Sequence, residues 1–425
     1  MKDLDLLSPS LGRPQLDRET LRIYEICDGC RRCYNLCPSF NTLLDRIDAV
    51  ESDVTKLSPA DRERVVQQCY YCKLCYNHCP YIPPHQYGLD FPRLMIASKQ
   101  VSARERGVRW RDRLLVKTDL MGRTASLLAP LVNWAMRAAW LRPLIERVTG
   151  IHRSRQVLPF HSETLPQWWV RRGSSPPMAP VHGKVALFAS CLTSYQATSV
   201  GKAAVQVLER NGVEVVLPEQ ACCGMPSFDI GDTDAIRKAA RANWQSLRPW
   251  LDRGYDVVSP VPSCSLMLKR EYPALWSGEE TTTLAQRTFD ICEYLMRLKK
   301  AGHLSGEFVR NPGRIAYQVP CHLRDQNIGF KSKELMELTG AHVEVVERCS
   351  GHDGTWGVKT EFFELSMGIA AKAVRDLEPM PADLIASDCP LSALQLEQAG
   401  AAERTRAKRV FHPIEILRDA YGLSA

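Results

Sequence analysis

The sequence predicts an α/β fold: a mostly helical N-terminal domain and a basic helical segment, followed by two similar α/β half-domains with parallel sheets. Three observations support this prediction. A cysteine pattern occurs twice within the first 80 residues, strand and helix patterns alternate from residue 181 onward, and further cysteines follow the strand ends. The 425 residues, 45% of them hydrophobic, suffice for several cores. The expected parts are residues 1–97, 98–180, 181–310 and 311–425.

The repeated cysteine pattern has the ligand spacing of a protein that holds two [4Fe-4S] clusters. Its two copies are Cys27, Cys30, Cys33, Cys37-Pro38 and Cys69, Cys72, Cys75, Cys79-Pro80. In two-cluster ferredoxins the fourth cysteine of each run binds the other cluster. We therefore expect a two-cluster ferredoxin domain, in which the ligands of cluster 1 are Cys27, Cys30, Cys33 and Cys79, and those of cluster 2 are Cys69, Cys72, Cys75 and Cys37. Structural zinc is the alternative, but zinc ligands usually come as two separated pairs.

The composition indicates a reducing compartment. Half of the sixteen cysteines have ferredoxin spacing, which favours metal ligation over a disulfide framework. Residues 1–20 contain no continuous apolar run, so we expect no secretory signal and a cytoplasmic protein. Lys73, which flanks the cluster cysteines, is a candidate to raise a cluster potential or to meet an acidic partner, unless it is simply solvated.

The net charge of +7 is concentrated in residues 93–155, where fourteen Lys and Arg stand against four Asp and Glu, a balance of +10. The longest uncharged stretch there, residues 124–136, has 13 residues, fewer than the ~20 that span a bilayer, so no transmembrane helix is expected. Apolar residues beside arginines suit a helix on an anionic membrane, on a partner subunit or on the protein itself. They are Leu127, Leu128, Leu131, Val132, Trp134, Ala135 and Trp140, beside Arg123, Arg137, Arg142 and Arg147. No nucleic-acid-binding fold is recognisable, and no nucleic acid partner is expected.

The middle of the N-terminal domain reads as helical, with a cap at Ser58-Pro59 before residues 60–68. Serines and prolines at 174–180 mark a linker. Six apolar runs then read as buried strands that alternate with helices, which implies parallel sheets. These strands are Val185–Ala189, Val213–Leu217, Asp256–Ser259, Ile315–Val319, His342–Val346 and Leu384–Ser387.

The remaining cysteines gather after these strands, where ligands bind in open α/β sheets. The first half has Cys191, Cys222, Cys223 and Cys264, and the second has Cys321, Cys349 and Cys389. The separations nearly match: 191 to 222 is 31 residues and 321 to 349 is 28, while 223 to 264 is 41 and 349 to 389 is 40. We therefore expect two homologous half-domains that face a shared cleft. Cys292, inside a helical pattern, reads as a packing residue.

The strand-end cysteines resemble the CCG motif of the heterodisulfide-reductase-like family, and the glycolate oxidase iron-sulfur subunits are similar in plan. The whole chain resembles one branch of this family, the C subunit of anaerobic glycerol-3-phosphate dehydrogenase. Motifs that carry the resemblance include Thr118-Asp119-Leu120-Met121-Gly122, Cys222-Cys223-Gly224, Glu271-Tyr272-Pro273, Pro320-Cys321-His322, Gly354-Thr355-Trp356-Gly357, Asp388-Cys389 and His412-Pro413-Ile414. The resemblance implies that the ferredoxin clusters relay electrons, that complete CCG motifs hold a further iron-sulfur cluster, and that a separate flavoprotein oxidises the substrate.

The sequence departs from this pattern in both halves. Met267 replaces the last cysteine of the first motif, which leaves four thiols for an iron-sulfur cluster or a zinc ion. Ser350 and Ser392 replace two cysteines of the second motif, and a hydroxyl is a poor iron ligand. His352 or His322 is then a candidate fourth ligand beside the three remaining cysteines; otherwise their thiols form a redox pair without metal.

These observations favour an iron-sulfur electron-transfer subunit. It would pass electrons from a flavoprotein dehydrogenase, or another redox protein, to a quinone or other acceptor, in the cytoplasm or peripherally on the inner face of the membrane. No catalytic residue is assigned, because the clusters supply the chemistry. The alternatives are a thiol or disulfide reductase with a metal cluster in the CCG cleft, and a zinc-bound docking scaffold. No GxGxxG turn indicates a flavin or nicotinamide site.

Overall fold

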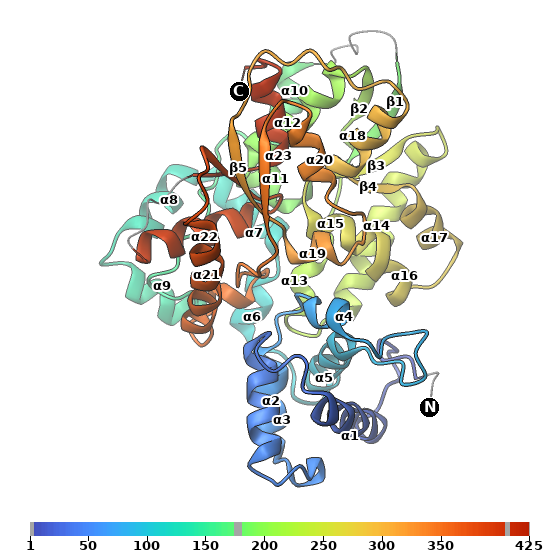
Figure 1. Cartoon of the computed structure of the whole chain (residues 1–425), viewed down its shortest axis with the longest axis vertical. Coiled ribbons are helices and arrows are strands. Elements are labelled where there is room, and N and C mark those ends of the chain that lie inside the picture. Colours follow the sequence, from blue (N-terminus) through green and yellow to red (C-terminus); the bar gives the residue numbers. More distant parts are fainter. Residues whose placement is uncertain (1–3, 174–180, 404–408, 425) are drawn as a thin grey trace.

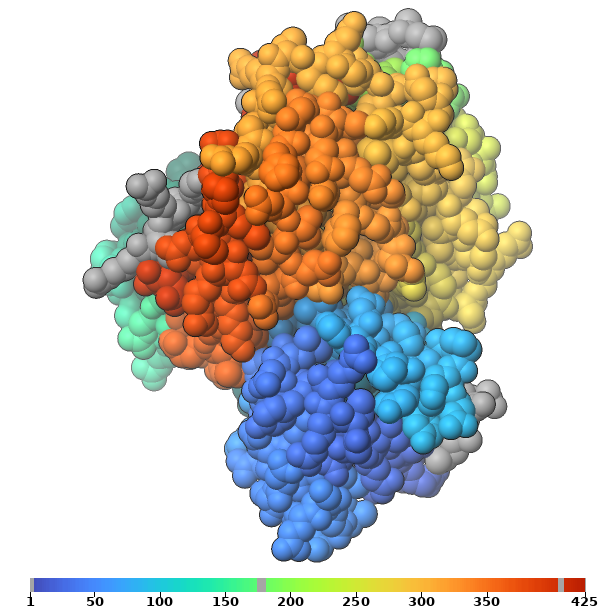
Figure 2. All heavy atoms as spheres, in the orientation of Figure 1, coloured from blue at the N-terminus to red at the C-terminus, as the bar shows by residue number. Residues whose placement is uncertain are grey.

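The computed structural model describes residues 4–173, 181–403 and 409–424, so the expected linker at 174–180 lies outside the described residues. The predicted fold class is confirmed. Two four-stranded parallel sheets each form the centre of one lobe, and a helical N-terminal module lies against both lobes (Figure 1). Figure 2 shows this module in blue as a distinct body below the orange second lobe and the yellow first lobe.

The N-terminal module is a cluster of helices around its own apolar core. The helices are α1 (Arg13–Cys30), α2 (Pro38–Asp48), α3 (Pro59–Gln68), α4 (Leu74–His78) and α5 (Phe91–Arg106), with a 3-10 turn η1 (Val54–Lys56). The predicted cap is confirmed, because the Ser58 hydroxyl accepts the backbone N–H of Asp61 at 3.1 Å. Phe40 stacks on Phe91 with ring centroids 4.3 Å apart, and both rings are buried.

The basic segment forms several short helices rather than one long helix. They are α6 (Trp110–Leu115), α7 (Thr118–Leu127), α8 (Ala129–Arg137), α9 (Arg142–Thr149) and α10 (Leu165–Arg172). Pro130 and Pro143 stand at the starts of α8 and α9, where proline is tolerated but cannot continue a preceding helix. Among the described residues, none of the helices is both long and apolar enough to cross a membrane.

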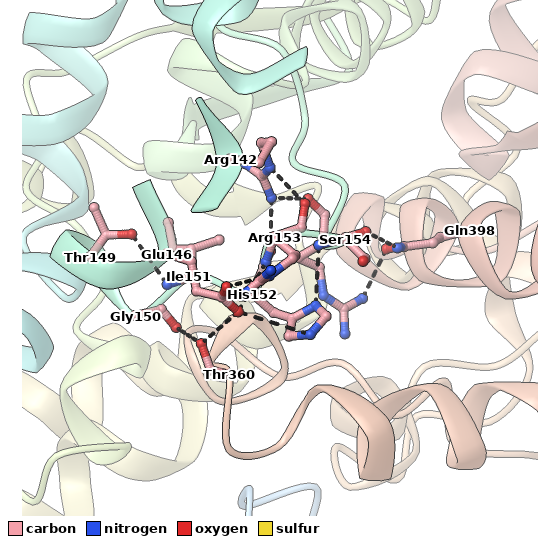
Figure 3. A network of polar contacts seen from close by, with 11 residues as sticks. Arg142, Glu146, Thr149, Gly150, Ile151, His152, Arg153, Ser154, Thr360 and Gln398 are labelled. Carbon is pink, nitrogen blue, oxygen red and sulfur yellow. Dashed lines mark hydrogen bonds and ion pairs between the residues drawn. The ribbon is translucent and has the colours of Figure 1, made fainter. Parts of the chain in front are cut away.

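Arg142 is a correction to the expected arginine face of this segment. Its side chain is buried, and it donates hydrogen bonds to the carbonyl oxygens of His152, Arg153 and Arg155 at 2.7 to 2.8 Å (Figure 3). The Arg142 guanidinium therefore holds the loop after α9 in place, and it is not available to a membrane or a partner. Arg137 and Arg147 are exposed, as expected.

The first lobe surrounds a parallel sheet of order β2-β1-β3-β4. Its strands are β1 (Gly183–Leu187), β2 (Val213–Val216), β3 (Asp256–Ser259) and β4 (Thr288–Asp290). Its helices are α11 (Ser190–Tyr195), α12 (Thr198–Arg210), α13 (Met225–Phe228), α14 (Thr233–Leu251), α15 (Pro262–Leu266), α16 (Tyr272–Leu275), α17 (Glu279–Gln286) and α18 (Ile291–Lys300), with a π-helical turn η2 (Met267–Glu271).

The second lobe repeats this arrangement with the order β6-β5-β7-β8. Its strands are β5 (Arg314–Gln318), β6 (His342–Val346), β7 (Leu384–Ala386) and β8 (Val410–Phe411). Its helices are α19 (Cys321–Arg324), α20 (Lys331–Glu337), α21 (Phe363–Leu377), α22 (Pro390–Ala402) and α23 (Pro413–Ala420), with a 3-10 turn η3 (Trp356–Val358). Ile414 and Leu417 of α23 are buried in the core of the first lobe, so the lobes share apolar surface.

All six predicted strands are present, but the fourth strand of each sheet was missed. β4 has three residues and β8 has two, too few to show a strand periodicity. The expected helix over residues 289–300 begins only at Ile291, because Asp290 caps it by accepting the N–H of Cys292. Asp290 therefore ends β4, and Cys292 lies in the first turn of α18.

Candidate iron-sulfur and thiol sites

The structure brings the thiols expected for cluster 1 together across the two cysteine runs. A mostly apolar cavity is lined by Cys27, Cys30, Cys33 and Cys79, and Cys75, expected for cluster 2, lines it as well. Cys27 and Cys30 end α1, and Arg31 leaves the helix with a positive φ of 52° that turns the chain back toward the cavity. The donor set fits an iron-sulfur cluster.

The thiols expected for cluster 2 divide between two neighbourhoods. Cys37, Cys69 and Cys75 lie close enough to one another to raise the pKa of Cys75, an effect that adds to that of its burial. The Cys72 side chain also lines a cavity together with Cys321 and Cys349 of the second lobe. The cysteine run of the module and the second lobe therefore meet at Cys72.

Burial keeps these module thiols protonated in the absence of a metal. It raises the pKa of Cys33 to about 11 and, together with neighbouring Cys69, that of Cys37 to about 12. A thiol with so high a pKa becomes a thiolate only when a cation replaces its proton. Cluster loading is thus expected to release protons.

In the first lobe the structure brings together all four predicted cysteines. The sulfur atoms of Cys191 and Cys222 are 3.8 Å apart, and Cys223 is in hydrogen-bonding contact with both Cys222 and Cys264. They follow β1, β2 and β3 at the expected edge of the sheet: Cys191 lies in α11, Cys222 and Cys223 in the loop after β2, and Cys264 in α15.

Asp119 in the first-lobe site was missed by the sequence reasoning. Its carboxylate accepts the backbone N–H of Cys222, and burial together with nearby Cys222 raises the pKa of Asp119 to about 6. Asp119 belongs to α7 of the basic segment, so this segment closes the site. The signal was present, because Asp119 lies in one of the motifs shared with the CCG family.

In the second lobe the two substituted serines are bonded to each other. The hydroxyls of Ser350 and Ser392 are 2.9 Å apart and buried, and Cys389 bonds to Ser392 rather than to Cys321 or Cys349. The positions of the two lost cysteines are therefore closed by a hydroxyl pair. The remaining thiols do not fit the complete motif of the first lobe.

The two candidate histidines beside this site differ in whether a ring nitrogen is left without a hydrogen-bond partner. His322 donates from Nε2 to the Tyr71 carbonyl at 3.0 Å, and its Nδ1 is hydrogen-bonded to the Ser263 hydroxyl at 2.8 Å. His352 is buried, and its Nδ1 has no hydrogen-bond partner. Both line the cavity that Cys72, Cys321, Cys349 and Cys389 also line, but His352 has the free nitrogen.

Equivalent cysteines of the two lobes have equivalent thiol partners. In the first lobe Cys222 is contacted by Cys191 and Cys223, and in the second lobe Cys349 is contacted by Cys321 and by Cys72 of the module. These neighbours lower the pKa of Cys222 in the first lobe and that of Cys349 in the second. The second neighbour of Cys349 is therefore a thiol of the module rather than of its own lobe.

The segment that carries Cys72 is wedged between the lobes. The Tyr70 hydroxyl bonds to Cys349 Sγ at 3.3 Å, and the Tyr70 ring packs on Trp356 at 4.6 Å. The Lys73 ammonium lies 2.7 Å from both Glu271 and Asp325, and all three side chains are buried. Lys73 therefore does meet acidic partners, but within its own chain.

The spacing of the predicted cysteine sets is wider than a single ion requires. Sulfurs around a tetrahedral zinc ion lie about 3.8 Å apart, given a Zn–S bond of about 2.3 Å. Within the described ranges, the one group of three or more Cys, His, Asp or Glu ligand atoms that all lie within 4.8 Å of one another is Asp290, Cys292 and Asp388. None of the predicted cysteine sets brings three ligand atoms that close together, although the Cys191 and Cys222 sulfurs are 3.8 Å apart.

Gly351, in the loop beside His352, is expected to be required for stability. It has a φ of +75°, and an added Cβ would lie 2.5 Å from the Ser366 carbonyl oxygen. Gly351→Ala should lower the free energy of unfolding by about 2–4 kcal/mol, because a left-handed backbone and a clash are combined. Urea unfolding of anaerobic protein measures this.

The matched control is Gly368→Ala in α21, where a Cβ meets nothing within 4 Å. It should leave the stability unchanged or raise it by up to about 1 kcal/mol. Equal stability of the two variants would contradict the strain at Gly351.

Two lobes with cysteines at their strand ends, behind a helical cysteine module, define a protein of the CCG class. Residues 185–269 and 315–397 match the cysteine-rich CCG domain, and residues 20–105 match the citrate utilization protein B Fer4-like domain. The chain therefore contains two copies of the CCG domain and one Fer4-like domain. These domains support iron-sulfur binding and a role in electron transfer.

Two groups of relatives extend the match. The chain is 29% identical to the C subunit of anaerobic glycerol-3-phosphate dehydrogenase of Escherichia coli K12 over 314 residues, 73% of this chain and 77% of that protein. It is 34% identical to lactate utilization protein A of Geobacillus thermodenitrificans over 223 residues, 48% of this chain and 87% of that protein. The corresponding protein of Geobacillus kaustophilus is 33% identical over 252 residues, 55% and 98% of the two chains.

Proposed function

We propose that the protein relays electrons from a dehydrogenase subunit through two [4Fe-4S] clusters of residues 1–97 to the CCG lobes, 181–310 and 311–425, and on to a quinone or another acceptor. Cluster 1 is bound by Cys27, Cys30, Cys33 and Cys79, and cluster 2 by Cys37, Cys69, Cys72 and Cys75. When bound, the clusters accept and release single electrons. The named relative, a subunit of a dehydrogenase, supports a dehydrogenase as the donor.

The observation that carries this proposal is that Cys72 lies beside Cys321 and Cys349, with which it lines one cavity. A ligand of cluster 2 that lies beside thiols of the second lobe gives electrons a short path out of the module. The surrounding side chains exclude water from this path, since Tyr70, Cys349 and Trp356 are buried. The clusters and the second lobe therefore form one route rather than separate sites.

A stopped-flow experiment tests the route. Protein reduced with dithionite is mixed anaerobically with a water-soluble quinone, and reoxidation of the clusters is followed optically. Cys349→Ala should slow reoxidation at least about tenfold while the paramagnetic signals of the reduced clusters keep their intensity. An unchanged rate with intact clusters would place the exit elsewhere.

Cys223→Ala in the first lobe is the matched control, because it removes a buried thiol whose thiol neighbours, Cys222 and Cys264, belong to the first lobe. Reoxidation should continue at the wild-type rate in this variant. If Cys223→Ala alone slows the reaction, the first lobe holds the exit, as the reductase alternative requires.

We further propose that α7, α8 and α9 rest on an anionic membrane surface. Leu127 is 79% exposed and Trp140 72% exposed, and Leu128, Leu131, Trp134 and Leu144 are also exposed on these helices and the turns between them. Exposed Arg137 and Arg147 form no ion pair among the described residues. A cavity of about 640 Å³ lies beside Arg137. Apolar side chains with unpaired arginines suit lipid headgroups.

Cosedimentation with phosphatidylglycerol-containing vesicles measures this contact. Leu127→Asp and Trp140→Asp should each weaken binding at least about tenfold, because inserting one such side chain contributes about 1.5–3 kcal/mol. Val309→Asp is the control, since Val309 is 70% exposed outside these helices. Vesicle binding that is equal in all variants, or absent in the wild type, would assign this surface to a protein partner instead.

A further inference from the structure

Three buried side chains outside the predicted sites converge between the two lobes. Asp290 ends β4, Cys292 lies in the first turn of α18, and Asp388 follows β7 of the second lobe. The Cys292 sulfur and one carboxylate oxygen of each aspartate lie within 4.8 Å of one another. Each side chain is no more than 1% exposed.

Most polar atoms of this group have protein partners, but one does not. Asp388 accepts hydrogen bonds from the Tyr317 and Ser332 hydroxyls, and Asp290 Oδ1 accepts the N–H of Cys292 at 2.9 Å. Asp290 Oδ2 is fully buried and has no hydrogen-bond partner. This orphaned oxygen belongs to the carboxylate that faces Cys292 and Asp388.

No side-chain cation compensates the two carboxylates. In the described part of the chain neither Asp290 nor Asp388 forms an ion pair with a lysine or arginine. Lys269, the basic residue that acts most directly on Asp290, is bonded to Glu293 at 2.8 Å. A buried carboxylate oxygen without a partner requires a proton or a cation.

The ligand types favour a borderline divalent cation. Zinc accepts thiolate and carboxylate together, with bonds of about 2.0–2.3 Å that place tetrahedral ligands about 3.3–3.8 Å apart. The distance from Cys292 Sγ to Asp388 Oδ1 is 3.8 Å. This group is thus nearer to the spacing of a single ion than are the cysteine sets of the clusters.

We propose that Asp290, Cys292 and Asp388 bind one zinc ion that joins the two lobes. The first lobe supplies two ligands and the second lobe one, so the ion fixes their relative position. Asp388 directly precedes Cys389 and the start of α22, and the ion therefore also anchors the loop that lines the second thiol site. This zinc site is independent of the clusters and of the proposed electron route.

Metal analysis of the full-length protein tests the proposal. Protein from zinc-supplemented medium is purified anaerobically, and zinc and iron are counted per chain. Cys292→Ser and Asp290→Asn should each contain about one zinc fewer than the wild type, with unchanged iron. Ser332→Ala, which alters a neighbour of Asp388 but removes no ligand, should keep the zinc.

Equal zinc content in the wild type, Cys292→Ser and Asp290→Asn would overturn the proposal and leave a shared proton as the compensating charge. X-ray absorption at the zinc edge keeps the test decisive if a variant does not fold. The wild type should show zinc with one sulfur and several oxygen neighbours. A shell of sulfur alone, or no zinc, would also overturn the proposal.

Discussion

Lys73→Met is expected to lower the free energy of unfolding by about 3–5 kcal/mol, the usual cost of leaving buried charges without their partner. Lys73 is 7% exposed and neutralises Glu271, which is 0% exposed, and Asp325, which is 3% exposed. Methionine fills similar space but leaves both carboxylates uncompensated. Because Lys73 belongs to the module and its partners to the two lobes, the loss falls on the docking of the module. Urea unfolding of the anaerobic holoprotein measures the change.

Lys56→Met is the control for Lys73→Met. Lys56 is 60% exposed, and its ammonium lies 3.5 Å from Asp53. Such a surface pair contributes no more than about 1 kcal/mol. Similar losses in the two variants would contradict the account of Lys73 as the charge that seats the module.

The dependence of the free energy of unfolding on pH at acid pH should show the same interaction between Lys73 and Glu271. Burial alone would raise the pKa of Glu271, but Lys73 and Arg93 lower it below its usual value. A carboxylate with a depressed pKa stabilises the fold above its unfolded pKa of about 4.3, and this contribution is lost as the pH falls through the folded value. The wild type should therefore lose the contribution below about pH 4, whereas Lys73→Met, which keeps Arg93, should show a smaller loss there.

Trp356→Ala is the second large effect, with an expected loss of about 3–5 kcal/mol in the free energy of unfolding. Trp356 is buried, packs between Tyr70 and Phe362 at centroid distances of 4.6 and 4.8 Å, and donates from Nε1 to the Gln67 carbonyl at 2.9 Å. The alanine leaves a cavity and an unpaired carbonyl oxygen. The Tyr70 ring then loses the surface that holds it against Cys349, so cluster reoxidation by the quinone should slow as well.

Trp110→Ala is the control, because it removes a tryptophan from the surface instead of from the packed position of Trp356. Trp110 is 65% exposed, and its removal should change the stability by no more than about 0.5 kcal/mol. Normal reoxidation in a folded Trp356→Ala variant would show that the packing around Tyr70 has no part in the route.

The fold and the cysteine sets could be predicted because their signals are local. Cluster ligands follow one another at intervals of two or three residues, and buried parallel strands appear as short apolar runs. The closing of the second site was not predictable in this way. Cys72 meets Cys349 and Lys73 meets Glu271 across long stretches of chain, 198 residues in the latter pair. Such contacts depend on how the module docks.

Cys292 is another residue whose long-range contacts could not be predicted from the sequence. Its helical pattern predicted a packing residue, and the structure does bury it completely. Nothing in the sequence indicates that Asp388 comes within 3.8 Å of its sulfur, because the two residues are 96 positions apart. Only the pairing of the lobes brings the Asp388 carboxylate to the thiol.

The most direct test of the electron-transfer account is the iron and sulfide content of the anaerobically purified full-length protein, together with its low-temperature paramagnetic spectrum after reduction. The account predicts at least about eight irons and eight sulfides per chain, with signals of reduced clusters, and about four irons fewer in each of Cys27→Ser and Cys69→Ser. A folded wild-type protein that contains no iron, or that contains zinc alone, would contradict it.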